Sequence, residues 1–203
     1  MMREGLRTLI SRERDLAVCG EAETAGQALD AVANLEPDLV LADISLPGRN
    51  GIELIKDIRA LQPVVLILVI SMHDESLYAE RILRAGARGY IMKQESGPTM
   101  IQAIRQVLAG RIYLSGKMSA RILENVTGKR AKASSIERLS DREFEVFQLI
   151  GRGKSTVQIA EELHLSPKTV EAHRAHVKEK LDLKTMTELV SFASRWVETQ
   201  DAR

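Results

Sequence analysis

The chain has 203 residues, of which 44% are hydrophobic and 28% charged, and its formal net charge is +1. This composition is that of an ordinary globular protein with one large or two modest domains, and it excludes a global electrostatic attraction to nucleic acid or membrane. Because the chain has a single cysteine, Cys19, it cannot form a disulfide bond within itself. We expect Cys19 to be a small buried residue of a strand.

The sequence pattern predicts neither a membrane helix nor a secretion signal. The longest apolar run, VVLILVIS, is far shorter than the roughly 20 residues that a membrane helix needs. The first fifteen residues carry charge throughout, without the apolar stretch of a signal peptide. We therefore expect a cytoplasmic protein that has no membrane partner.

The first part of the chain alternates strand-like and helix-like segments. Strands are predicted at four apolar runs, 16–22, 38–43, 64–71 and 88–92. Helices are predicted where apolar residues recur at helical spacing, at 24–35, 51–61, 75–85 and through 101–108. This alternation indicates an α/β domain with a parallel sheet covered on both faces. Right-handed crossovers place the carboxyl ends of all strands at one edge, where ligand chemistry is expected.

The character of the sequence changes after about residue 114. We expect one domain over 1–113 and a second domain over 137–203. Between them, 114–136 is expected to hold a short helix at 116–126 and a polar, partly basic linker. This second domain has no strand pattern. It predicts four helices, at about 141–152, 156–163, 167–181 and 185–197.

Capping residues mark the helix starts of the second domain. Ser140 and Ser155 are each followed three places later by Glu or Gln, which is the capping-box pattern, and Ser166 precedes a proline. The connection between the second and third helices, LHLS, is very short. Two short helices joined so closely indicate a helix-turn-helix.

A helical wheel over 168–181 separates a buried face from an outward face. The buried face carries Val170, Val177 and Leu181, with His173 and Arg174 beside them. The outward side carries Lys168, Glu171, Ala172, Ala175, His176, Lys178 and Glu179. Small outward residues allow a helix to lie deep in a major groove, where alanine can meet thymine methyls and glutamate can accept from cytosine N4. The alternative left open is an ordinary solvated helix face.

The last helix and the histidines leave further alternatives. One stripe of the last helix carries Met186, Leu189, Ala193 and Trp196, which either completes the core or forms a dimer seam. The histidines at 164, 173 and 176 lack the partners of a tetrahedral metal site. No Ser/His/Asp set or phosphate-cradling glycine loop is present, so an independent enzyme is not expected.

The second domain resembles the LuxR-type helix-turn-helix of NarL/FixJ response regulators. The similarity runs from Leu139 to Val190, and the segment IAEELHLSPKTVEAHR is highly specific for it. The resemblance implies a four-helix module that binds double-stranded DNA, with 166–181 as recognition helix. It implies base contacts from Glu171, Ala172 and Ala175, and contacts to phosphate or the helix start from Lys168, Thr169 and Arg174. We add Lys178 as a phosphate contact. It also implies homodimers through the last helix, by Leu189 and Trp196.

The first domain resembles a receiver domain, with the doubly wound strand order 2-1-3-4-5. The loop ADISLPGRNG gives Asp43 as phosphoacceptor, and Ser71, Tyr90 and Lys93 fall at the switch and phosphoryl-contact positions. Arg49 and Gln94 depart from the usual pattern without removing chemistry. A strand-end carboxylate is a competent nucleophile, and phosphoryl transfer depends mainly on charge neutralisation, which a lysine supplies.

The resemblance also implies an element that this sequence lacks. In the family, a first strand ending in two acids precedes a segment like REGLRTLI, and these acids hold Mg²⁺. Here REGL begins at Arg3, so Asp43 is left as a partial metal site. Two explanations compete, a start site placed too far downstream and a degenerate receiver that works without phosphate.

The resulting hypothesis is a two-component response regulator. A sensor histidine kinase phosphorylates Asp43, and a homodimer then reads two half-sites about one helical turn apart or at a related spacing. One rival is a DNA-binding regulator that is independent of phosphorylation. The other is a protein that sequesters a kinase or a partner regulator without touching DNA.

Overall fold

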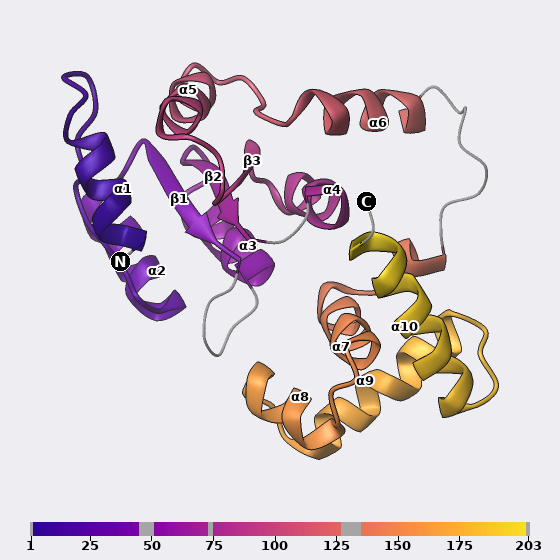
Figure 1. Ribbon diagram of the computed structural model, residues 1–203. Coiled ribbons are helices and arrows are strands. Elements are labelled where there is room, and N and C mark those ends of the chain that lie inside the picture. The colour runs from indigo at the N-terminus through magenta and orange to yellow at the C-terminus, as the bar shows by residue number, and fades with distance from the viewer. Residues whose placement is uncertain (1, 45–50, 73–74, 127–134, 202–203) are drawn as a thin grey trace. The chain divides into compact units, whose positions relative to one another are not determined.

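A computed structural model describes residues 2–44, 51–72, 75–126 and 135–201, and it divides the chain into two compact units, Met1–Lys129 and Arg130–Arg203 (Figure 1). Residues 127–134, which make up most of the expected linker, lie outside the described residues, as do Pro47, Arg49 and the rest of the loop at 45–50. None of the described helices is both long enough and apolar enough to cross a membrane.

The first unit is built on a three-stranded parallel sheet of order β1-β2-β3, formed by Leu39–Asp43, Leu66–Ser71 and Gly89–Met92. The register pairs Asp43 with Ile70 and Ser71 with Met92, so the carboxyl ends of the three strands meet at one edge. Five of the six residues of β2 are buried, as expected for a strand covered on both faces. The α/β class expected from the sequence is confirmed.

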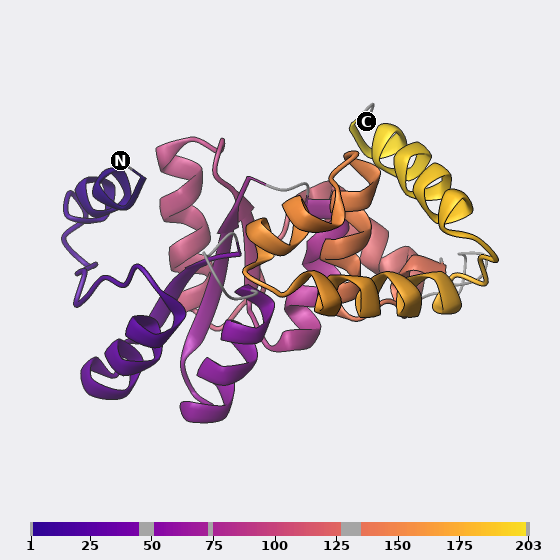
Figure 2. The ribbon, with the colours of Figure 1, turned by 90° about the horizontal axis from the view of Figure 1, so that it is seen from below.

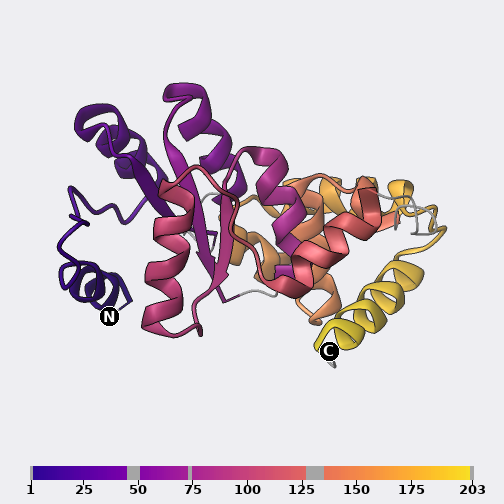
Figure 3. The same cartoon turned by 90° about the horizontal axis from the view of Figure 1, so that it is seen from above.

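The described residues of the first unit form the helices α1 Met2–Ile10, α2 Ala25–Leu35, α3 Gly51–Leu61, α4 Glu75–Ala85, α5 Gly97–Leu108 and α6 Gly116–Val126. Helix α5 packs through Ile101 and Ile104 on Leu68, Ile70 and Ile91 of the sheet. Figures 2 and 3 show α5 on one face of the sheet and α3 and α4 on the other. The sheet is therefore covered on both faces, as the alternating pattern predicted.

The predicted strand at 16–22 is wrong. This segment has no regular secondary structure, and Cys19 within it is exposed rather than buried. A strand is stable only when its backbone groups pair with a neighbouring strand, and none of the strands that the structure describes pairs with this segment. Strand β1 is accordingly the edge of the described sheet, and four of its five residues are only half-buried.

In the second unit, the residues that the structure describes form a 3₁₀ turn at Ser135–Arg138 and the helices α7 Asp141–Gly151, α8 Thr156–Leu163, α9 Pro167–Lys180 and α10 Met186–Asp201. Each predicted cap is confirmed. Ser140 and Ser155 form reciprocal capping boxes, and the Ser166 side chain accepts from the backbone of Thr169 at 3.0 Å. Helix α7 packs against both α9 and α10, and α8 packs against α9. The predicted helix-turn-helix is therefore α8 and α9.

The apolar stripe of α10 completes the core of the second unit. Leu189 is fully buried, and the ring of Trp196 meets Phe144 and Phe147 edge-on, with centroids 5.7 and 5.4 Å apart. The expectation that Leu189 contacts a second chain is therefore corrected, because its side chain has no accessible surface to offer. Trp196 is half-buried, and its part in a dimer stays a prediction.

Candidate functional site

The predicted phosphoacceptor, Asp43, lies at the carboxyl edge of the sheet and is paired with Lys93. Asp43 is the last residue of β1, and Lys93 follows directly after β3. The Lys93 ammonium donates to Oδ2 of Asp43, and the two side chains are 15% and 30% exposed. Two residues that are 50 positions apart in sequence therefore form one partly sheltered ion pair that solvent can still reach.

The backbone around Asp43 leaves no room for a side chain at the start of α3. A Cβ atom at Gly51 would lie 2.5 Å from Cα of Ile44 and 3.0 Å from the Asp43 carbonyl oxygen. Both contacts are with backbone, which cannot rotate away. Glycine at this position thus allows α3 to begin directly against the strand end that carries the carboxylate.

The predicted switch residues, Ser71 and Tyr90, are both buried. Ser71 ends β2 with no exposed surface, and its carbonyl accepts from the backbone of Lys93 at 2.8 Å. This bond fixes Lys93 at the same edge as Asp43. Tyr90 is 1% exposed within β3, and its backbone donates to the carbonyl of Tyr113 at 3.0 Å. The roles of both side chains stay predictions.

The residues that the structure describes do not fit a magnesium site. Mg²⁺ prefers several oxygen ligands in near-octahedral geometry. Within the described ranges, no group of three or more His, Cys, Asp or Glu side chains gathers at one point. At the strand edge, Asp43 is the sequence-predicted metal ligand, and its carboxylate is bonded to Lys93.

The recognition helix α9 presents the two faces that the wheel predicted. Val170 and Val177 are fully buried, whereas Ala172 and Ala175 are exposed. Lys168, Glu171, His176 and Glu179 are also exposed, and Lys178 is half-buried. Thr169 belongs to the cap, because its hydroxyl lies 2.7 Å from that of Ser166. The small side chains thus stand on the accessible side of the helix.

A buried carboxylate on α7 holds the far end of α9. Glu143, which is 4% exposed, accepts from the backbone of Ser140 at 2.7 Å and from Nζ of Lys180 at 2.7 Å. The sequence identified Glu143 only as part of a capping box. Its bond to Lys180 joins residues 37 positions apart, and no local pattern signals such a contact.

Arg142, the neighbour of Glu143 on α7, bonds to α8, the other helix of the helix-turn-helix. Its guanidinium donates to the carbonyl of Leu163 at the end of α8 and to Glu145, both at 2.8 Å. Burial and the positive charge of Arg142 lower the pKa of His173, which disfavours the protonated form of this histidine. Helix α7 thus fixes the end of α8 and the end of α9.

The Glu143 bond makes folding stability depend on pH. Burial by itself favours the protonated carboxyl, but hydrogen bonds from Lys180 and from Ser140 outweigh it, so the pKa of Glu143 lies below its usual value. Because the folded pKa is lower than the unfolded value of about 4.3, the contribution is present above that pH. It is lost as the pH falls through the folded pKa.

We expect Glu143→Gln to lower the free energy of unfolding of the second unit by about 1–3 kcal/mol at pH 7, because a buried charge-assisted bond is lost. The difference from wild type should shrink below about pH 4, as measured by urea unfolding at several pH values. Glu162→Gln is the control, since Glu162 is 46% exposed and lies 3.6 Å from Lys154. An effect of Glu143→Gln that stays constant down to about pH 3 would contradict the assignment.

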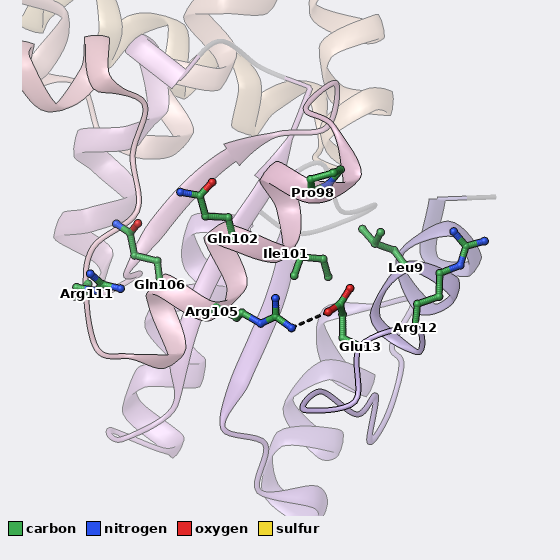
Figure 4. Close-up of a pocket in the computed structure, with 9 residues that line it drawn as sticks. All are labelled: Leu9, Arg12, Glu13, Pro98, Ile101, Gln102, Arg105, Gln106 and Arg111. Carbon is green, nitrogen blue, oxygen red and sulfur yellow. Dashed lines mark hydrogen bonds and ion pairs between the residues drawn. The ribbon is translucent and has the colours of Figure 1, made fainter.

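A hollow lies between α1 and α5 and is lined by none of the site residues predicted from the sequence (Figure 4). Across it, Arg105 of α5 donates to Glu13 at 2.6 Å and to Asp15 at 2.7 and 2.9 Å. The pKa of Asp15 is lowered by its bonds to Arg105. These bonds tie the segment after α1 to the helix that covers one face of the sheet.

Comparisons with known proteins match both units. Residues 1–105 match the response regulator receiver domain, and residues 137–193 match the bacterial regulatory proteins of the luxR family. The oxygen regulatory protein NreC of Staphylococcus carnosus is 35% identical over 95% of this chain and 92% of its own length. The response regulator GacA of Pseudomonas aeruginosa is 31% identical over 96% of this chain and 91% of its own.

A solved structure supports the same assignment. The chain is similar to the solved structure of the RcsB response regulator of Salmonella typhimurium, which was described in terms of conformational dynamism for DNA interaction. The two are 25% identical with a TM-score of 0.56, over 95% of this chain and 92% of that one. The similarity extends across both units of the chain.

Proposed function

This chain belongs to the LuxR family of two-component response regulators, which are DNA-binding transcription factors, and from this premise we propose that phosphorylation of Asp43 controls its binding to DNA. The observation that carries the proposal is the pairing of Asp43 with Lys93 where the strand ends meet. This pair supplies a nucleophile and a neutralising charge at the edge where parallel sheets place their chemistry.

The proposed transfer needs little from the protein beyond positioning and charge. A carboxylate oxygen of Asp43 attacks the phosphorus of a phosphorylated histidine on a sensor kinase, and the bond from phosphorus to the histidine nitrogen breaks as the new bond forms. Lys93 then pairs with the oxygens of the phosphoryl group, which carries a charge of about −2. The Ser71 hydroxyl and the Tyr90 ring are the proposed elements that respond to this added charge.

The proposed DNA contacts follow the exposed side of α9. Ala172 and Ala175 let the helix approach the floor of the major groove, and Glu171 beside them accepts from a base edge. Lys168 and Lys178 contact phosphate. A homodimer reads two half-sites. Because Leu189 is buried, the side of α10 that carries Val190, which is 40% exposed, is the side available to a second copy.

We expect Lys178→Ala to weaken binding to all DNA sequences about equally. A phosphate contact releases a condensed counterion, so its loss should reduce the slope of log affinity against log salt by about 1. Fluorescence anisotropy from low to high salt measures this slope. Lys117→Ala removes a lysine from α6 in the other unit and serves as the control. An unchanged slope for Lys178→Ala would remove this residue from the set of phosphate contacts.

The proposal as a whole is tested by footprinting DNA from the promoter region of the protein's own gene. We expect a protected site that appears at lower protein concentration after treatment with a small-molecule phosphodonor. Protection that is the same with and without phosphodonor would favour the regulator that is independent of phosphorylation. No protection at low salt, together with retained binding to a sensor kinase, would favour the sequestering protein.

A further inference from the structure

A polar contact that the sequence did not predict joins the two helices of the helix-turn-helix. Thr156, the first residue of α8, donates its hydroxyl proton to Oε1 of Glu171 on α9 at 2.6 Å. Nη1 of Arg174 donates to the same hydroxyl oxygen and lies 3.4 Å from Oε1 of Glu171. One carboxylate oxygen on the exposed side of α9 is therefore held from two directions.

The hydroxyl of Thr156 is oriented by these two bonds together. A threonine hydroxyl has a single proton, and accepting from Arg174 leaves this proton free to point at Glu171. The Arg174 side chain is 17% exposed, and its Nε is buried without a hydrogen-bond partner among the described residues, so the bonds that orient the guanidinium are those of Nη1. Its positive charge also offsets the repulsion that a glutamate would meet near DNA phosphates.

The second oxygen of Glu171 remains available. The side chain is 53% exposed, and among the described residues no partner contacts Oε2. A carboxylate has about four acceptor positions, so bonds to Oε1 leave Oε2 able to accept from a base. If the contact only joined α8 to α9, Arg174 and Thr156 would suffice, and no exposed carboxylate would be needed.

We propose that Thr156 and Arg174 are positioning residues that hold the Glu171 carboxylate ready to accept a hydrogen bond from cytosine N4 in the major groove. This inference rests on the proposed DNA-binding function. An exposed glutamate has several rotatable bonds, and fixing them before binding removes an entropy cost from recognition of the correct base. Thr156 thereby contributes to base specificity without touching DNA.

The test begins with selection of binding sites by the wild-type chain from random duplex DNA. Affinities are then measured for the selected site and for copies that each carry one changed base pair. The proteins compared are the wild type, Thr156→Val, Thr156→Ser, Glu171→Gln and the double variant Thr156→Val/Glu171→Gln. Thermal unfolding of each confirms that the fold is retained.

We expect Glu171→Gln to lose discrimination at one cytosine in each half-site. Thr156→Val should reduce discrimination at that same base pair by roughly 2- to 10-fold, the range that follows from freeing one long side chain. Thr156→Ser keeps the hydroxyl and should retain discrimination. In the Glu171→Gln background, Thr156→Val should have no further effect, because Thr156 acts through Glu171.

Three results would overturn the proposal. Thr156→Val could weaken binding to every sequence by the same factor, which is the behaviour of a purely structural contact. It could leave discrimination unchanged, or change it at base pairs that Glu171→Gln does not affect. These results leave the proposed DNA-binding function intact, whereas failure of the wild-type chain to select any sequence would overturn both.

Discussion

Replacing Ala175 with glutamate should abolish sequence-specific DNA binding. Ala175 is exposed on the outer side of α9, where a helix in the major groove approaches the bases. A glutamate adds bulk at this contact and a negative charge beside the phosphates. Like charges brought together in an interface cost several kcal/mol, so we expect affinity to fall by roughly 100-fold or more.

The same change should leave the fold intact, because substitutions at exposed positions away from special contacts alter stability by about 0.5 kcal/mol or less. Thr199→Glu is the matched control, since Thr199 is exposed on α10 of the same unit, on the side opposite Val190, and receives the same charge. Electrophoretic mobility shifts with a selected site give both affinities. Comparable losses for the two variants would show that net charge, rather than α9, determines binding.

Phosphoryl uptake should be lost when Asp43 becomes asparagine. An amide is a far weaker nucleophile toward phosphorus than a carboxylate, so the variant should show no stable gain of a phosphoryl group by intact-protein mass spectrometry. Lys93→Met should still take up the group, but more slowly by roughly 10²-fold or more, because one neutralising charge is removed.

Asp38→Asn is the control for this experiment. Asp38 is exposed and immediately precedes β1, so the substitution changes the same chemical group at the opposite end of the strand. It should take up phosphoryl at the wild-type rate. Uptake that persists in Asp43→Asn would place the phosphoacceptor elsewhere in the chain.

Local signals predicted the helices well because each signal lies within the element that it forms. The capping residues Ser140, Ser155 and Ser166 mark helix starts through bonds to backbone only three residues away. The faces of α9 followed from the position of Val170 and Val177 on the wheel. The expected and observed helices therefore agree closely from residue 24 onward, whereas α1 was not among the expected helices.

Features that depend on distant partners could not be predicted in this way. Residues 16–22 have strand-like composition, but a strand needs a neighbour, and composition does not show whether one is present. The apolar side chain of Leu189 is compatible with a place in the core and with a place in a dimer seam. Only its burial in the second unit distinguishes these two possibilities. The bond between Glu143 and Lys180 likewise depends on tertiary structure.

The two candidate sites, at the strand edge and on α9, differ in how much of their geometry could be predicted. Asp43 and Lys93 were predicted from the resemblance to receiver domains, at positions that follow two predicted strands, and the parallel register brings them together. In contrast, the wheel predicted that Arg174 flanks the buried face, but not that its guanidinium bonds to Thr156 of α8. The Arg174 side chain is 17% exposed, and its contact with phosphate stays a prediction.

The proposed function depends above all on a phosphoryl group at Asp43 raising the affinity of the chain for DNA. The affinity of the wild-type chain for a selected site is therefore measured before and after phosphodonor treatment, beside the same pair of titrations for Asp43→Asn. We expect tighter binding after treatment in the wild type, by roughly 5- to 150-fold as is typical of coupled sites, and no change in the variant. Equal affinity in all four titrations would contradict control of DNA binding by Asp43.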